Sequence, residues 1–516
     1  MDEREIVFSP ERIGNVPDVS EEIRKAVKGR DFRITKHYID ARHKNDIKII
    51  FRVAFDDPSD DFSLKEALPY RGSAFRSDCK RPVIVGFGPA GMFSGLVLAR
   101  YGLRPVIIDK GSSVEKRSRD VAQYKEKGII DPSSNIQFGE GGAGTFSDGK
   151  LYTGVSSGLK GFIAQTMARY GAPVEIMYDS HPHVGTDNLV KVVKGIRQEI
   201  LSLGGEIRFD EELLDLDLKG TGRSRVTGIT TDKGYIECDD LILAVGNSSR
   251  ELFRRYRDIL CLQSKPFAVG VRIEHLRKDI DTAMYGFDTA LYKNISAANY
   301  KLAVDTSTGK KLYTFCMCPG GEVVPSASFP ESVVTNGMSY STRDGINSNS
   351  ALLIPFDPKD TDCNTMTGIN FQDMLEKKAY NIAGGNSKAP IMTYGDLRKG
   401  KSGTYPSRIS PTYSPGTVPS DFNELFPMEF VDTLREGIAL MGRKIKGFDC
   451  DDCILTAVET RSSSPVRIPR NKETFESVSV SGVFPVGEGA GYAGGIMSSA
   501  IDGIRCANTI AAGYLV

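Results

Sequence analysis

The sequence contains no tryptophan, only five histidines and no excess of charge of either sign. Lysine plus arginine and aspartate plus glutamate each number 66, so the formal net charge of the 516 residues is zero. Nucleic-acid-binding domains are usually strongly basic, so the balanced charge argues against that class of protein. A net charge of zero is still compatible with a local basic pocket that binds a phosphate group. Without tryptophan, a bound aromatic ring must stack on other side chains.

Long apolar runs are also missing. No stretch approaches the roughly 18 apolar residues that a membrane span requires, and the first residues, MDEREIVF, lack the pattern of a secretory signal. The nine cysteines are an odd number scattered along the chain, unlike a disulfide framework. We therefore expect a cytoplasmic protein with a small-molecule substrate and no nucleic-acid or membrane partner. Its oligomeric state is left open.

The clearest motif is a glycine-rich turn between a β-branched run and a helical stretch, Gly86-Phe87-Gly88-Pro89-Ala90-Gly91. Gly86 allows a sharp turn, Gly88 lets a pyrophosphate approach the backbone, and Gly91 allows close helix packing, while Pro89 and Ala90 open the helix. The next strand ends at Asp109, where a carboxylate can accept hydrogen bonds from ribose hydroxyls. Lys110 follows it and is expected to lie in the same site. The alternative is a structural turn without a ligand.

Two distant segments carry further glycines. Residues 240–246, DLILAVG, contain Ala244 and Gly246 after an apolar run. Near the C-terminus, VFPVGEGAGYAGGIMSSAIDGIRCA places a glycine-rich turn before a long helix. The positive end of that helix would stabilise negative charge on a bound ring. The candidate ligand residues of this second turn are Gly487, Glu488, Gly494, Gly495 and Ile496. A glycine-rich loop without a ligand is again the alternative.

These segments resemble the FAD-binding signatures of the glutathione-reductase-like class, in which Glu488 would bind the ribityl chain. Longer stretches extend the resemblance over nearly the whole chain to a family of uncharacterised bacterial FAD-dependent dehydrogenases, some of them labelled NAD-utilising. These stretches are FGEGGAGTFSDGKL (138–151), HPHVGTDNL (181–189), KPFAVGVRIEH (265–275), FCMCPGGEVV (315–324), VVTNGMS (333–339), ETRSSSPVRI (459–468) and VGEGAGYAGGIMSSAIDGI (486–504). The resemblance implies an FAD fold and a redox activity. Asp109 departs from it, because glutamate is usual there.

The glycine-dense segment 138–151 can run along a flavin ring, so Gly141, Gly142 and Thr145 are expected to contact the cofactor, and Lys150 is a catalytic candidate. It lacks the paired cysteines that disulfide reductases carry after their first helix.

Three further side chains complete the predicted site. His183 is preferred to His181 as an acid or base, although capping or packing is an alternative. Arg461 suits an anionic substrate, or else holds loops together. Arg117 is expected near the adenosine phosphates, with solvated surface as the alternative.

The remaining cysteine motifs are Cys316-Met317-Cys318 and Cys450-Asp451-Asp452-Cys453. They invite redox or metal roles, but their spacing is not that of a zinc site, so we expect small buried hydrophobic residues and no metal.

We therefore predict an α/β protein with a discontinuous Rossmann-like FAD-binding domain, an inserted mixed β-rich domain and a small N-terminal α+β unit. The expected bounds are 1–78 for the N-terminal unit, 81–264 and 447–516 for the FAD-binding domain, and 265–446 for the insertion. Residues 385–425 are expected to be extended loop, and Asn336-Gly337 to be a hairpin turn.

The predicted function is an FAD-dependent oxidoreductase that transfers hydride through flavin N5. NAD(P)H is a candidate electron donor that would dock transiently, because we count one nucleotide loop between a strand and a helix. A flavoprotein acting on a macromolecule such as transfer RNA, or a non-catalytic FAD-binding module, are the alternatives.

Overall fold

The computed structural model describes residues 2–55, 61–76, 79–360 and 364–516. Five short strands, most of them apolar, form a parallel sheet in the order β22, β10, β4, β5, β6. Ile84 of β4 lies between Ile242 of β10 and Ile107 of β5. The strands are β4 (Val83–Val85), β5 (Val106–Ile108), β6 (Glu206–Arg208), β10 (Leu241–Leu243) and β22 (Val483–Pro485). We call this part the parallel-sheet domain.

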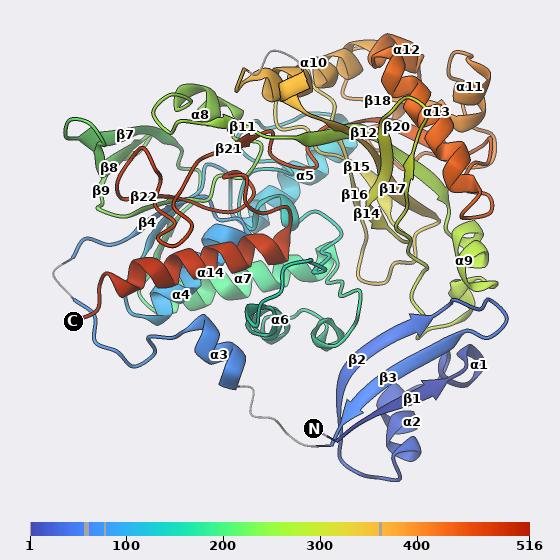
Figure 1. Cartoon of the computed structure of the whole chain (residues 1–516), viewed down its shortest axis with the longest axis horizontal. Helices are drawn as coiled ribbons and strands as arrows, with labels where there is room; N and C mark the ends of the chain where they lie inside the picture. The colour runs from blue at the N-terminus through green and yellow to red at the C-terminus, as the bar shows by residue number, and fades with distance from the viewer. Residues whose placement is uncertain (1, 56–60, 77–78, 361–363) are drawn as a thin grey trace.

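Both faces of the parallel sheet are covered, which explains why β4, β5, β10 and β22 are apolar throughout, whereas the edge strand β6 carries Glu206 and Arg208 and is only partly buried. Ile84, Ile107 and Ile242 pack into a core with four long helices, while Val83 and Val85 face the opposite core. Figure 1 shows α14 lying along α4. The first face carries α4 (Pro89–Arg100), α6 (Leu159–Arg169), α7 (Thr186–Ser202) and α14 (Ile496–Ala512). The second carries β7 (Leu213–Lys219), β8 (Arg225–Thr231), β9 (Gly234–Glu237) and α8 (Arg250–Arg255).

The chain leaves this domain and returns to it at one place. The outgoing strand β11 (Gln263–Ser264) pairs antiparallel with the returning strand β21 (Val466–Arg467). The intervening residues form an inserted domain, and β22 then rejoins the parallel sheet beside β10. The predicted discontinuity of the parallel-sheet domain is therefore present in the structure.

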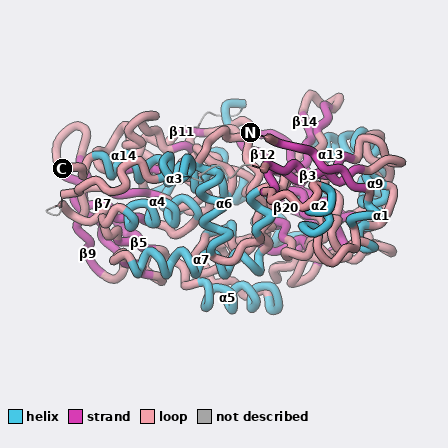
Figure 2. Tube along the Cα trace, turned by 90° about the horizontal axis from the view of Figure 1, so that it is seen from below, coloured by secondary structure: helices cyan, strands magenta, loops and turns pink. Residues whose placement is uncertain are grey.

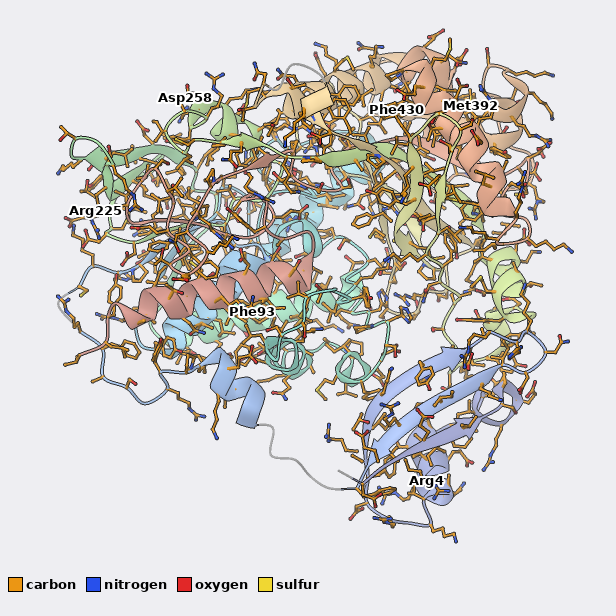
Figure 3. The ribbon with its side chains drawn as sticks, in the orientation of Figure 1. Arg4, Phe93, Arg225, Asp258, Met392 and Phe430 are labelled. Atoms are coloured by element: carbon orange, nitrogen blue, oxygen red, sulfur yellow. The ribbon has the colours of Figure 1, made fainter. Side chains whose placement is uncertain are left out.

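The inserted domain is built on a seven-stranded mixed sheet in the order β13, β14, β17, β12, β20, β18, β19. Its core lies apart from that of the parallel-sheet domain: Figure 3 labels Phe93 in the first core, and Met392 and Phe430 in the second. Figure 2 likewise shows α4 on one side of the molecule and β14 on the other. The strands are β12 (Phe267–Leu276), β13 (Ala303–Asp305), β14 (Lys311–Cys318), β17 (Asn347–Phe356), β18 (Ala389–Thr393), β19 (Thr417–Pro419) and β20 (Ile454–Glu459).

Several helices and a small hairpin complete the inserted domain. They are α9 (Arg277–Tyr285), β15 (Glu322–Pro325), β16 (Thr335–Met338), α10 (Thr367–Ile382), α11 (Tyr394–Lys399), α12 (Phe422–Leu425) and α13 (Met428–Gly442). Helix α5 (Val114–Lys127) of the parallel-sheet domain reaches this hairpin, since Tyr124 packs with Ala327 and Val334. The two domains are thus in direct contact at this hairpin.

The N-terminal unit is a three-stranded antiparallel sheet, β1-β3-β2, with two helices. It contacts the inserted domain, where Asn15 donates to Leu291 O at 3.0 Å and Asn294 donates to Ile13 O at 2.9 Å. Its elements are β1 (Glu3–Phe8), α1 (Pro10–Ile13), α2 (Val19–Ala26), β2 (Arg33–Asp40) and β3 (Lys48–Ala54). Part of the segment that follows lies outside the described residues, and helix α3 (Asp61–Ala67) comes next.

Three sequence predictions need correction. The boundary at 446/447 is wrong, because β20 pairs with β12 and β18 inside the inserted sheet, so the chain returns only at β21. Residues 385–425 are not one extended loop, since they contain β18, α11, β19 and α12. Asn336-Gly337 is not a turn, because both residues lie within β16 and pair with β15.

Candidate functional site

A cavity of about 1060 Å³ lies where the parallel sheet meets the inserted domain. The residues that follow four of the parallel strands all line it: Gly86 after β4, Asp109 after β5, Ala244 after β10 and Val486 after β22. Open α/β sheets bind their ligands beyond the carboxyl ends of their strands. The cavity is therefore placed where such a sheet would hold a ligand.

The first glycine-rich turn forms one side of this cavity. Gly86, Gly88, Pro89 and Ala90 line it, and α4 starts directly behind them with Gly88 as its N-cap. The first N–H groups of a helix have no intrahelical partner and favour an anion. Gly91 has the packing role predicted for it, because a Cβ there would lie 1.9 Å from the Gly86 carbonyl oxygen.

Asp109 lies at one end of the cavity, but it already has partners. Its carboxylate accepts hydrogen bonds from the backbone N–H groups of Phe87 and Gly111, each at 2.8 Å. Burial raises the pKa of Asp109 despite these bonds. Lys110 points into an adjoining cavity of about 200 Å³, where its Nζ lies 3.8 Å from the Phe138 ring centroid. Ribose binding by Asp109 stays a prediction.

Three predicted cofactor residues lie behind the cavity wall. Arg117 is fully buried, and its guanidinium donates to the carbonyls of Asn135, Ile136, Gly139 and Glu140. The phosphate role predicted for Arg117 is therefore corrected: it holds a loop.

Gly141 and Thr145 pack against each other, since a Cβ on Gly141 would meet Thr145 Oγ1 at 1.9 Å. They form the layer beneath Gly142, which does line the cavity. Their predicted cofactor contact is corrected accordingly.

The second glycine-rich turn reaches the same cavity. Ala244, Gly246, Gly487, Glu488, Gly494, Gly495 and Ile496 all line it. A Cβ built on Gly246, Gly494 or Gly495 would meet no atom within 4 Å, so these glycines face open space. Helix α14 begins at Ile496 and directs its N-terminus into the cavity. We call residues 86–90, 244–246 and 487–496 the glycine wall.

Glu488 is the acid of the glycine wall. Its carboxylate accepts a hydrogen bond from Asn247 Nδ2 at 2.7 Å. Burial, against the weaker opposing charge of Lys265, raises the pKa of Glu488 to about 7. A carboxyl group that titrates near neutrality can both accept and donate hydrogen bonds to a hydroxylated ligand.

Lys150 lines the cavity beside strand β14 of the inserted domain. Its Nζ donates to the Met317 carbonyl and lies 3.5 Å from Asp148 Oδ2. Burial lowers its pKa, but the charge of Asp148 and the two nearby thiols raise it more, so the pKa of Lys150 is raised overall. Lys150 is therefore a cation and hydrogen-bond donor at neutral pH.

The preference for His183 over His181 is corrected. The imidazole of His183 is turned away from the cavity, with Nδ1 3.2 Å from Asp148 Oδ2 and Nε2 3.0 Å from Tyr340 O. His181 lines the cavity instead. A β-bridge pairs Lys150 with His183, which fixes the side on which each histidine of this segment lies.

Arg461 lines the cavity, yet its guanidinium is occupied. It pairs with Glu376 at 2.8 Å and donates to the hydroxyls of Ser248 and Ser328. Glu376 also pairs with Arg250 at 2.7 Å, and the charges of both arginines outweigh burial to hold the pKa of Glu376 at about 2. The predicted role in substrate binding is therefore corrected: Arg461 holds the inserted domain to the parallel-sheet domain.

The expectation that all four cysteines are only small buried hydrophobic residues is also corrected. Cys316 lines the cavity and Cys318 lies buried behind it, with their sulfurs 3.9 Å and 3.7 Å from Lys150 Nζ. The C-x-C spacing was visible in the sequence, but nothing local to it indicated that a lysine 166 residues away would lie against it. We call Cys316 and Cys318 the thiol pair.

Further cations line the cavity. Arg343 lies 3.4 Å from Asp148 Oδ2, on the same side as Lys150, and Lys301 also lines the cavity. Lys265 and Arg467 line it next to the glycine wall, since the charge of Lys265 acts on Glu488 and the Arg467 guanidinium lies 5.2 Å from the Tyr492 ring centroid. We call Lys150, Arg343, Arg461 and Cys316 the charged wall. A cavity with one backbone-lined side and one cationic side suits an anionic ligand.

Within the described part of the chain, no group of three or more histidine, cysteine, aspartate or glutamate side chains could hold a metal ion. Every helix in the same residues is too short or too polar to traverse a bilayer.

Comparison with known proteins identifies a matching family model and a similar protein. Residues 266–462, which correspond to the inserted domain, match the family model described as "FAD-dependent protein, C-terminal domain-like". The chain is 42% identical over 492 residues to an uncharacterized protein of Clostridium beijerinckii, covering 92% of this chain and 91% of that protein.

The similarity to two solved structures is weak. Glycine oxidase from Bacillus cereus has a TM-score of 0.31 and 10% identity, covering 84% of this chain and 95% of that chain. L-proline dehydrogenase from P. horikoshii has a TM-score of 0.34 and 10% identity, covering 84% and 94%. Similarity at this level says nothing about activity or substrate. Residues 266–462 carry the FAD-dependent protein C-terminal domain. The identity to the Clostridium protein, by contrast, extends over nearly the whole chain, and the chain belongs to the same family as that protein.

Proposed function

We propose that the protein is an FAD-dependent oxidoreductase that exchanges hydride with a small anionic substrate enclosed between the glycine wall and the charged wall. One observation carries the proposal. The N-termini of α4 and α14, which begin about 400 residues apart in sequence, line one continuous cavity, with Asp109 at one end and Glu488 between the two domains.

The residues present fit FAD. Gly246, Gly494 and Gly495 form a cradle that a Cβ would fill, because no atom lies within 4 Å of the position of such a Cβ. The N–H groups at the start of α4 suit a diphosphate, and the positive end of α14 suits a ring that gains negative charge. The cavity volume of about 1060 Å³ exceeds the usual size of a drug-like ligand site, which leaves room for a dinucleotide and a substrate.

Residues of the glycine wall would hold the cofactor, Gly86 to Ala90 at the diphosphate and Gly494 to Ile496 at the ring. Bound FAD supplies hydride transfer through its N5 atom. Glu488 would hold ribityl hydroxyls, and its proton can be kept or released near neutral pH because its pKa is about 7. The smaller adjoining cavity beside Lys110 extends the site beyond Asp109.

On the substrate side, this chain's residues bind and orient an anion. Lys150 and Arg343 face the cavity as cations, and Asp148 between them fixes both positions. Lys150 does not act as a base, since its pKa is raised, and it serves as a fixed positive donor. Residues of the inserted domain line the cavity together with those of the parallel-sheet domain, and a ligand held between the two domains would be shielded from water.

The test begins with the purified chain. We expect a yellow protein that releases about one FAD per chain on denaturation, identified by mass spectrometry. Anaerobic addition of NADH or NADPH should bleach the flavin if NAD(P)H is the donor. A chain that is colourless and takes up no added FAD would overturn the proposal, whereas FAD that neither nucleotide bleaches would overturn only the donor.

A further inference from the structure

The thiol pair lies at an irregularity of β14. The pairing of β14 with β17 shifts register between Phe315 and Cys318, and Cys316 has a φ of 44°. A non-glycine residue in this left-handed region is strained, and such strain concentrates at functional sites. The bulge turns Cys316 toward the cavity while Cys318 stays buried.

One ammonium group lies against both sulfurs. Lys150 Nζ is 3.9 Å from Cys316 Sγ and 3.7 Å from Cys318 Sγ, and it donates to the carbonyl of the residue between them. Arg272, fully buried in β12, adds a second cation: it donates to Cys316 O at 2.9 Å and lies 3.9 Å from Cys318 Sγ. The two sulfurs therefore share a cationic environment on one face of the strand.

The fixed charges around the thiol pair do not cancel. Three cations, Lys150, Arg272 and Arg343, face two carboxylates, Asp148 and Glu459. His183 also faces Asp148. One negative charge on the thiol pair would balance the group. The hydrogen bond from the Cys318 thiol, and then the charges of the two nearest cations, outweigh burial and hold the pKa of Cys316 well below its ordinary value.

The two sulfurs differ in access. Cys316 faces the cavity, whereas Cys318 is fully buried and its pKa is raised by burial and by its hydrogen bond to Cys316. A cavity-lining thiolate with a buried, protonated thiol two residues away against the same ammonium group is the arrangement that thiol–disulfide exchange requires, with one sulfur to attack and one to resolve.

We propose that Cys316 and Cys318 form a redox-active dithiol at the charged wall, and that the substrate it reduces is a small organic disulfide bearing carboxylates. The cationic residues Lys301 and Arg343 line the same side of the cavity and would hold the carboxylates. Repeated turnover rests on the proposed function, which supplies the reducing equivalents, whereas a single exchange needs only the two cysteines.

The exchange balances as follows in atoms and electrons. The Cys316 thiolate attacks one sulfur of the disulfide, the sulfur–sulfur bond breaks, and one product leaves as a thiolate while a mixed disulfide forms at Cys316. Cys318 then gives its proton to that departing thiolate and attacks Cys316 Sγ. The second product leaves as a thiolate, so the dithiol loses two electrons, the substrate gains two, and one proton is transferred.

Glutathione disulfide is the probe for the test. Protein treated with dithiothreitol, desalted and kept anaerobic should release two glutathiones per chain from this site, and non-reducing peptide mapping by mass spectrometry should show a Cys316–Cys318 disulfide. Cys318→Ala should stop at a mixed disulfide on Cys316 with one glutathione released, and Cys316→Ala should do neither. A stable glutathione adduct on Cys316 of the unaltered chain, or an unreacted Cys316, would overturn the proposal.

Two controls separate this site from other thiols. The double variant Cys450→Ala, Cys453→Ala removes the C-x-x-C pair, which does not line the cavity, and should leave the Cys316–Cys318 disulfide unchanged. Cystamine, a cationic disulfide, should react at least about ten-fold more slowly than glutathione disulfide because like charges repel at the charged wall. Equal rates would refute the carboxylate specificity.

The pH dependence of Cys316 reactivity tests the role of the Lys150 ammonium group. Lys150→Met should raise the pH at which Cys316 becomes reactive and slow its alkylation by iodoacetamide at pH 6 about ten-fold, while Lys150→Arg restores it. The exposed Cys261 is the internal reference and should react alike in all variants. Because these measurements follow disulfides and alkylation, they can fail while FAD remains bound, and they can succeed in a chain without FAD.

Discussion

The two walls of the cavity differ in composition: one is mainly backbone and the other is mainly charged side chains. The glycine wall presents backbone of three loops and the N-termini of α4 and α14, and it carries one carboxyl side chain, Glu488. The charged wall presents side chains that lie in buried ion pairs, such as Arg461 with Glu376 and Lys150 with Asp148. The first wall depends on shape and close approach, whereas the second depends on partners that remain charged.

The largest effect is expected at the charged wall. Glu376→Gln would remove the carboxylate that Arg250 and Arg461 share. Arg250 would keep its pair with Asp373, but Arg461 would lose its carboxylate, and an uncompensated buried charge costs about 3–5 kcal/mol of the free energy of unfolding. Urea unfolding followed by circular dichroism measures this loss. Glu331→Gln is the matched control, because Glu331 forms an exposed pair with Lys377 and should have no measurable effect. If Glu376→Gln and Glu331→Gln lowered the free energy of unfolding equally, the buried pair would not contribute more than the exposed one.

The same carboxylate predicts an acid limb in the stability profile. The pKa of Glu376 is about 2 in the folded chain against an ordinary 4.5, so its contribution is fully present above pH 4.5 and is lost as the pH falls toward 2. Unfolding free energy measured between these pH values should fall less steeply for Glu376→Gln than for the unaltered chain. Parallel slopes would show that another group controls this limb.

At the glycine wall, the effect depends on which glycine changes. Gly91→Ala would bring a methyl group within 1.9 Å of the Gly86 carbonyl oxygen and force α4 from the sheet, at a cost of about 2–3 kcal/mol. The melting temperature of the chain freed of flavin should fall accordingly. An unchanged melting temperature would mean that the backbone at Gly86 can move aside for the added methyl group without loss of stability.

Gly494→Ala sharpens this contrast. Its added methyl group meets no protein atom within 4 Å, so the stability of the flavin-free chain should not change, whereas FAD affinity should fall about ten-fold because the methyl group occupies the cofactor cradle. Fluorescence titration of the flavin measures this. Undiminished affinity would place the ring elsewhere.

The glycine wall could be anticipated from sequence because its information is local. The turn at Gly86–Gly91 is set by residues adjacent in the chain, and the start of α14 at Ile496 follows from Gly494-Gly495 and the helical run behind them. Gly91 could even be assigned its packing role, since helix–strand contact within one βαβ unit is a short-range relation.

The charged wall could not be predicted from local sequence in this way. Which histidine faces the cavity depends on the bridge between Lys150 and His183, and the exposure of Cys316 depends on a bulge against β17. Arg461 suited an anion by its chemistry, but its partner Glu376 lies 85 residues away. The boundary placed at 446/447 failed for the same reason, because β20 finds its partner β12 about 180 residues earlier. Pairings over such distances leave no local pattern.

The smallest expected effect tests the one acid of the glycine wall. The pKa of Glu488 is about 7 in the folded chain against an ordinary 4.5, because burial disfavours its charge. The folded state therefore holds this proton more tightly than the unfolded state, so the stabilisation is present below pH 4.5 and is lost as the pH rises through 7. Since the carboxyl group is only partly buried, we expect a loss of about 1 kcal/mol.

Glu488→Gln removes the titration while keeping the shape. The flavin-free variant should therefore become more stable relative to the unaltered chain as the pH rises from 5 to 8, and its difference should level off above the pKa of about 7. Melting temperatures at matched ionic strength measure this. A difference that stays constant with pH would show that Glu488 titrates normally, and the glycine wall would then carry a full negative charge facing the ribityl position.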